Sequence, residues 1–138
     1  MHAKEYFEYV RDTKREYDNA MLTRLYGRPH QTTFGKSSDI SDPTVAQFME
    51  LAEADAIIEY CAPIIAECEL VIKGLRVVMT DTSKIPDVLH MRYLELLPPS
   101  EIMERLHITR RRESYLCELG FKLADSMGKA LLIEKSKN

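Results

Sequence analysis

Apolar residues recur at helical spacing through most of the chain. From about residue 2 to residue 26 they lie three, four or seven positions apart with charged residues between them, which predicts an amphipathic helix. From Val45 to Met79 they become denser and keep that spacing, which predicts a second, much longer helix. Its apolar stripe is wide enough to need cover on two sides, from the rest of the chain or from a second copy. We therefore expect a homo-oligomer, as a dimer.

Local signals mark the start and the middle of the long helix. Ser41 and Asp42 are capping residue types, and Pro43 follows them in the first turn, where a missing N–H costs nothing. Pro63 removes one hydrogen bond from the helix ladder. We expect Pro63 to bend the helix or to divide it in two.

The segment between the two helices, residues 27–41, is polar and predicted to be a loop. No acid lies between Asp18 and Asp39, while several basic residues do. The segment is either a solvated loop or a basic arm that follows a phosphate backbone.

A boundary follows the long helix and divides the chain into an N-terminal helical portion, residues 1–83, and a C-terminal portion, residues 84–138. The first holds 9 Lys and Arg against 14 Asp and Glu, a net charge of −5, and the second holds 10 against 8, a net charge of +2. Residues 105–112 contain four arginines and no acid. This basic patch predicts an anionic partner.

Three short elements are predicted in the C-terminal portion. The first opens at Lys84, Ile85 and Pro86, and its residues 88–97 form a short helix that stops before Pro98 and Pro99. A second helix covers residues 100–106, His107 and Ile108 form a turn, and Thr109 caps the next helix. Two helices about a short turn make a helix-turn-helix. At 100° per residue, the last helix has a predicted buried side of Leu116, Leu119, Gly120, Leu123 and Met127 and an exposed side of Arg110, Arg111, Ser114 and Glu118.

The exposed side offers the groups that recognise a DNA duplex. Arg110 and Arg111 can each donate two hydrogen bonds to guanine O6 and N7, and Ser114 can contact a base edge or a phosphate. Arginines nearer the flanks would neutralise phosphates, as would the amides at the helix start. Three consecutive arginines can also form a solvated helix start, although they oppose the helix macrodipole there. The candidate DNA-binding residues are Arg105, Thr109, Arg110, Arg111, Arg112, Ser114, Tyr115 and Lys122.

Residues 89–97, 101–110 and 121–127 together resemble the helix-turn-helix of sigma factor region 4. With the acidic helical N-terminal part and the stretch from Lys36 to Pro43, the chain resembles phage and prophage late-gene regulators of the RinA and ArpU type. The motif covers about 40 residues. The resemblance implies a DNA-binding transcriptional activator that contacts host RNA polymerase.

Two positions depart from that pattern. Met103 stands where these motifs usually carry alanine or another small residue. Glu113 stands where an apolar residue normally anchors the recognition helix. Either Tyr115 takes over that packing or Glu113 pairs locally, with Arg112 or Arg105.

Catalytic and metal-binding patterns are weak. Glu104 and His107 form a single Glu-x-x-His unit, whereas di-iron bundles use two, so no metal site is expected. Cys61, Cys68 and Cys117 show no Cys-x-x-Cys spacing and are predicted to be small buried hydrophobes. No triad signal and no phosphate-binding glycine loop is evident. We expect neither enzyme activity nor a cofactor.

The first residues lack the apolar core of a signal peptide, and no apolar run is long enough to span a membrane. We therefore expect a cytoplasmic protein with no membrane contact.

These features predict an all-α protein with long N-terminal helices, expected to oligomerise, and a C-terminal helix-turn-helix like that of sigma region 4. The predicted function is sequence-specific DNA-binding regulation of transcription, as a phage or prophage late-gene activator. Its expected partners are double-stranded DNA, host RNA polymerase and a second copy. Two alternatives stay open: a protein-interaction module, such as an antirepressor or polymerase-binding factor, which the net charge of −3 favours, and the small subunit of a phage DNA-packaging machine.

Overall fold

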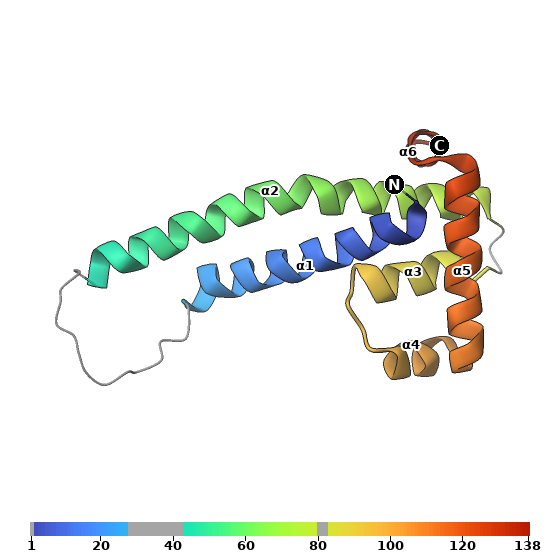
Figure 1. Ribbon diagram of the computed structural model, residues 1–138, viewed down its shortest axis with the longest axis horizontal. Helices are drawn as coiled ribbons and strands as arrows, with labels where there is room; N and C mark the ends of the chain where they lie inside the picture. Colours follow the sequence, from blue (N-terminus) through green and yellow to red (C-terminus); the bar gives the residue numbers. More distant parts are fainter. Residues whose placement is uncertain (1, 28–42, 80–82) are drawn as a thin grey trace.

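The computed structural model describes residues 2–27, 43–79 and 83–138, with the backbone alone for Pro43 and Thr44. The predicted loop 27–41, apart from Gly27, and the predicted capping residues Ser41 and Asp42 lie outside the described residues. Within the described ranges the chain is helical and contains no strand, which confirms the all-α prediction. The helices are α1 (Ala3–Tyr26), α2 (Pro43–Val78), α3 (Ile85–Tyr93), α4 (Pro99–Leu106), α5 (Arg110–Met127) and α6 (Lys129–Lys135) (Figure 1).

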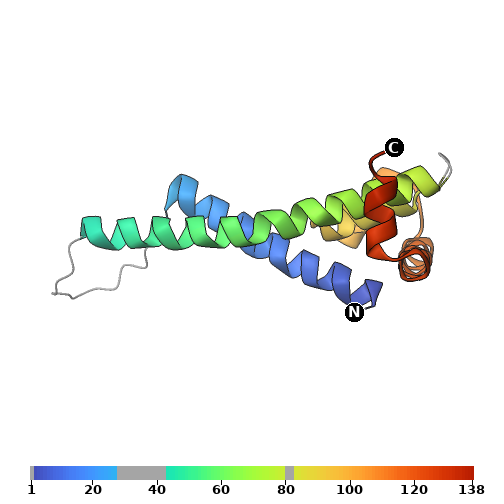
Figure 2. The same ribbon diagram turned by 90° about the horizontal axis from the view of Figure 1, so that it is seen from above.

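The two long helices α1 and α2 form an antiparallel hairpin, and the four shorter helices gather at one end of it (Figure 1). Figure 2 shows α1 crossing α2 at a shallow angle. We call the crowded end, residues 3–13, 61–79 and 83–138, the body. We call the opposite end, residues 20–27 and 43–54, the tip.

Aromatic rings join three helices at the centre of the body. Phe7 of α1 is fully buried, with its ring centroid 5.5 Å from that of Tyr93 and 5.8 Å from that of Phe121. Burial raises the pKa of the Tyr93 hydroxyl to about 12. One hydrophobic cluster contains residues from α1, α2, α3, α5 and α6. The core therefore includes residues from both sides of position 83.

The start of α1 is also fixed from the body. The backbone N–H of Ala3 donates to Oδ1 of Asp125 on α5 at 2.7 Å. This bond satisfies one of the amides that a helix leaves unpaired at its start, and it anchors the first turn of α1 to the end of α5.

The last helix, α6, was not predicted, and it covers the end of α2. The two backbones approach so closely at Gly74 that a Cβ there would lie 2.0 Å from the carbonyl oxygen of Leu132. The Leu132 side chain is fully buried. Only glycine fits at position 74 without moving α6.

Pro63 does not divide α2, which runs unbroken from Pro43 to Val78. The helix bows gently along its length (Figure 1). Pro63 is exposed, so water can reach the backbone carbonyl that loses its partner. Of the two outcomes predicted for Pro63, division of the helix is wrong, and the gentle bow agrees with a bend.

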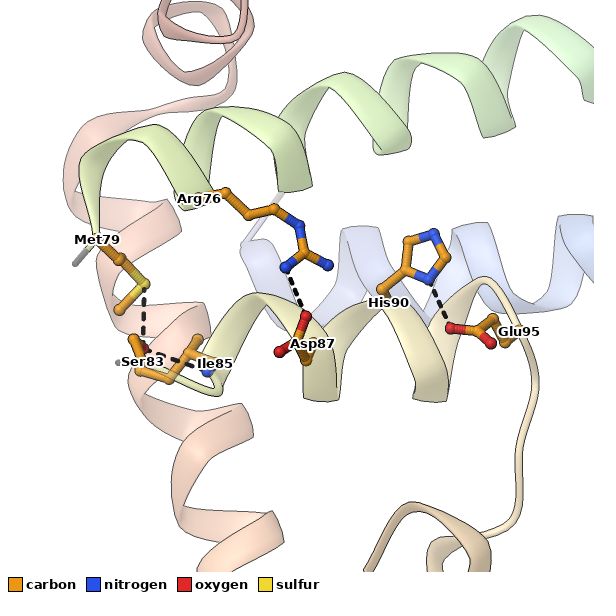
Figure 3. Close-up of polar contacts among 7 residues, drawn as sticks. All are labelled: Arg76, Met79, Ser83, Ile85, Asp87, His90 and Glu95. Carbon is orange, nitrogen blue, oxygen red and sulfur yellow. Dashed lines mark hydrogen bonds and ion pairs between the residues drawn. The ribbon is translucent and has the colours of Figure 1, made fainter. Parts of the chain in front are cut away.

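The helix α3 begins at Ile85, within the predicted opening at Lys84 to Pro86, but ends at Tyr93, before the predicted end at Leu97. Its start is fixed by Ser83, whose Oγ accepts from the Ile85 N–H at 3.3 Å (Figure 3). Asp87 in its first turn pairs with Arg76 of α2 at 2.5 Å (Figure 3).

The helix α3 ends at Tyr93, several residues before Pro98, because the chain turns at Leu96. Leu96 adopts a left-handed conformation with φ 58°, which terminates helical geometry. His90 Nδ1 lies 2.7 Å from Glu95 Oε2 across this turn (Figure 3). The prediction missed it because left-handed geometry is usual for glycine, not leucine.

None of the helices in the described ranges combines the length and the apolar character needed to cross a membrane.

Candidate nucleic-acid interface

The α4 and α5 helices and the turn between them lie where the sequence predicts them. His107, with φ 54°, ends α4 in the left-handed conformation. The hydroxyl of Thr109 accepts a hydrogen bond from the Arg112 N–H at 3.1 Å, which confirms the predicted cap of α5. Figure 1 shows α4 and the start of α5 together, on the side of the body away from α6.

The buried stripe of α5 is rotated relative to the prediction. Its fully buried residues centre roughly 60° from the predicted centre at 3.6 residues per turn. Leu116 and Gly120 are buried as predicted, while Leu119, Leu123 and Met127 are only half-buried. The buried residues of α5 are Glu113, Leu116, Cys117, Gly120 and Ala124.

An ion pair between a buried acid and a half-buried arginine accounts for this rotation. Glu113, 1% exposed, faces α3, where Arg92 Nη1 lies 2.8 Å from its Oε1. Burial lowers the pKa of Arg92. Its electrostatic interactions with Tyr93, Glu113 and Cys117 have a larger, opposite effect, so the pKa is raised overall. The charged pair therefore fixes the start of α5 against α3.

Arg92 was not among the predicted partners of Glu113, and the expected arrangements of Glu113 are wrong. Glu113 pairs with neither Arg112 nor Arg105, because its side chain points into the body toward α3. Tyr115 does not replace it in the core, since 48% of Tyr115 is exposed. A buried acid within an otherwise apolar stripe was the available signal that a partner lies on another helix.

The eight candidate residues on α4, on α5 and at the cap between them share one property: every side chain is exposed. The side chains of Arg110 and Arg111 also make no hydrogen bond or ion pair within the described part of the chain. The guanidinium of Arg112 lies 5.4 Å from the centroid of the Tyr115 ring. The predicted exposed side of α5 is confirmed for Arg110, Arg111, Ser114 and Glu118.

Arg105 is held differently from the other arginines. Its Nη2 donates to Glu101 Oε1 at 2.8 Å within α4. A second carboxylate, that of Glu95, has Oε1 3.9 Å from Arg105 Nη1. An external anion would have to compete with these two acids.

Lys122 shares the outward face of α5 with Arg111 and Tyr115, because these positions are four and seven residues apart. It lies about 16 Å from Arg111 along the helix at 1.5 Å per residue. Glu118 is exposed between Tyr115 and Lys122 on the same face. The basic cluster proper therefore consists of Arg110, Arg111 and Arg112, which we call the arginine end.

The three cysteines are free and buried, which confirms their predicted role in packing. Burial raises the pKa of Cys68 to about 12 and that of Cys117 to about 11, with help from neighbouring carboxylates. Their thiols are therefore protonated at neutral pH. Among the described residues no three His, Cys, Asp or Glu side chains come together as a metal site would require.

Comparison of the chain with protein-family models, with curated proteins and with solved structures gives no match.

Proposed function

We propose that the protein is a sequence-specific DNA-binding regulator of transcription that inserts the start of α5 into the major groove. The arginine end carries the proposal. Arg110 and Arg111 are exposed and without partners in the described residues, on a helix that is capped by Thr109 and held by Glu113.

The position of these charges favours an anionic partner over a purely structural role. Cations at a helix N-terminus oppose the macrodipole and cost stability. A duplex would offset that cost, because its phosphates accept hydrogen bonds from the helix amides and its guanines accept two from an arginine. Arg111 lies at the middle of the outward face and is the best placed to contact a base.

The neighbouring residues suit phosphate contacts. Arg112 lies on the first turn of α5 and Arg105 near the end of α4, and both are exposed. Arg105 must exchange its bonds to Glu101 for a phosphate, so it should contribute less affinity than Arg112.

The resemblance to late-gene regulators of the RinA and ArpU type narrows the proposal to activation of phage or prophage genes. Contact with host RNA polymerase belongs to the same proposal. Both statements rest on the residues that carry the resemblance.

Selection of bound sequences from a random duplex pool, followed by fluorescence anisotropy on the selected and a scrambled duplex, tests this function. Arg111→Ala should weaken binding to the selected duplex by about 1–3 kcal/mol, whereas Arg105→Ala should weaken binding to both duplexes equally. Arg15→Ala is the matched control, because Arg15 is an exposed arginine on α1, and binding should not change.

Binding should also weaken by orders of magnitude as salt rises from low to moderately high concentration. Two results would contradict the proposal: a pool that yields no enriched duplex, or equal affinities for Arg111→Ala and Arg15→Ala.

A further inference from the structure

The side of α2 that faces away from α1 carries a regular exposed stripe. Its positions alternate four and three residues apart through the described helix, and all ten are exposed. Eight of the ten are apolar. The stripe consists of Val45, Met49, Ala52, Ala56, Glu59, Pro63, Ala66, Leu70, Lys73 and Val77.

This spacing is the heptad pattern of a helix that packs along another helix. None of the described helices covers the stripe: α1 lies against the opposite side of α2, which buries Ala54, Cys61 and Cys68. Leu70 and Val77 remain 40% and 45% exposed, and Val45 and Met49 more so. Alanine at positions 56 and 66 would allow a second helix to approach closely.

The two charged residues of the stripe, Glu59 and Lys73, favour an antiparallel α2 helix as its partner. Glu59 and Lys73 lie seven residues before and seven residues after Ala66. In an antiparallel pair of α2 helices centred on Ala66, Glu59 of each copy lies level with Lys73 of the other. A parallel pair in register would oppose Glu59 to Glu59 and Lys73 to Lys73, and like charges at a helix interface are unfavourable.

We propose that a second copy of this chain binds here, with the two α2 helices antiparallel about a two-fold axis at Ala66. Two Glu59–Lys73 pairs then flank a centre of alanine, proline and leucine side chains. This contact does not rest on the proposed DNA-binding function, because it uses no residue of α4 or α5.

Sedimentation equilibrium of the full chain provides the first test. The wild type should be a dimer, and Ala66→Glu should be a monomer with unchanged helical circular dichroism, because Ala66 is exposed and glutamate favours helices. Ala130→Glu on α6 makes the same change at an exposed position outside the stripe and should leave the dimer intact.

Charge reversal tests the antiparallel order. Glu59→Lys and Lys73→Glu should each weaken the dimer at least tenfold, and the double variant should restore it. In a parallel dimer neither single change would weaken association, since each like-charged pair would stay like-charged.

Cysteine cross-linking tests the register. Ala66→Cys should form a disulfide between copies under mild oxidation, because the two-fold axis brings the two residues 66 together. Ala52→Cys should not, as residues 52 would be far apart. A monomeric wild type, a ring of many copies, or equal cross-linking at both positions would overturn the proposal.

Discussion

The body and the tip of the hairpin use the same two helices in opposite ways. In the body α2 is covered by α1, α3 and α6, and Val71, Ile72 and Leu75 are buried. Among the described residues of the tip, α2 contacts α1 alone, and Phe48 and Met49 are 72% and 65% exposed. Burial of apolar surface is the main source of stability. The body should therefore fold as the stable unit, while the tip contributes little.

Matched phenylalanine truncations test this difference most strongly. Phe7→Ala removes a fully buried ring from the body and should lower the free energy of unfolding by about 3–5 kcal/mol. Phe48→Ala removes an exposed ring from the tip and should change it by less than about 0.5 kcal/mol. Urea unfolding followed by circular dichroism measures both, and similar losses would refute the contrast.

The buried pair that sets α5 gives the next largest effect. Arg92→Ala leaves the buried carboxylate of Glu113 without its partner and should cost about 3 kcal/mol. Replacing both residues, Arg92→Met with Glu113→Leu, should recover most of that loss because neither charge remains buried. Thermal and urea unfolding of the three proteins provide the measurement. A double variant no more stable than Arg92→Ala would show that the pair does not act as a unit.

The close contact between α2 and α6 predicts a smaller loss. Gly74→Ala places a Cβ against the backbone of Leu132 and should cost about 1–3 kcal/mol by displacing α6. Limited proteolysis should then cut the C-terminal segment first. Gly120→Ala is the comparison, because a Cβ there would meet side-chain atoms, Leu89 Cδ1 at 2.8 Å and Ile85 Cγ2 at 2.9 Å, and no backbone atom, so its loss should be smaller. Equal effects of the two substitutions would argue against a rigid α2–α6 contact.

The smallest expected effect is a difference in the alkylation rates of the three cysteines. At pH 8 a thiol with a pKa of about 12, such as Cys68, is ionised in roughly one molecule in ten thousand, and the thiolate is the reactive form. Cys61 lies nearer the tip along α2. Pulsed alkylation with mass spectrometry should therefore label Cys61 before Cys68 and Cys117 through local opening. The reverse order would mean that opening begins in the part of the body farther from the tip.

Local sequence signals predicted much of the fold. Three signals depend only on residues close together in the sequence: the periodicity of residues 2–26, the proline at position 43 and the threonine at position 109. They predicted the extent of α1, the start of α2 and the start of α5. The helix α6 was missed, although Gly128 followed by an apolar run was a usable signal.

The sequence predicted which residues of α5 are candidates for the site, but it did not predict the rotation of α5 about its axis. The exposed arginines of α5 follow from helical periodicity, which is local. The rotation of α5 depends on Arg92, which lies 21 residues before Glu113 in sequence and on another helix. No pattern within α5 specifies which residue pairs with the buried Glu113. Several partners were therefore compatible with the sequence.

The most direct test of DNA recognition by the arginine end is an NMR titration of the labelled protein with its selected duplex. The backbone amides of residues 109–115 should show the largest chemical-shift changes, while those of the tip, residues 20–27 and 43–54, should stay unchanged. Shifts confined to the tip, or none at saturating duplex, would contradict the proposal that α5 binds DNA.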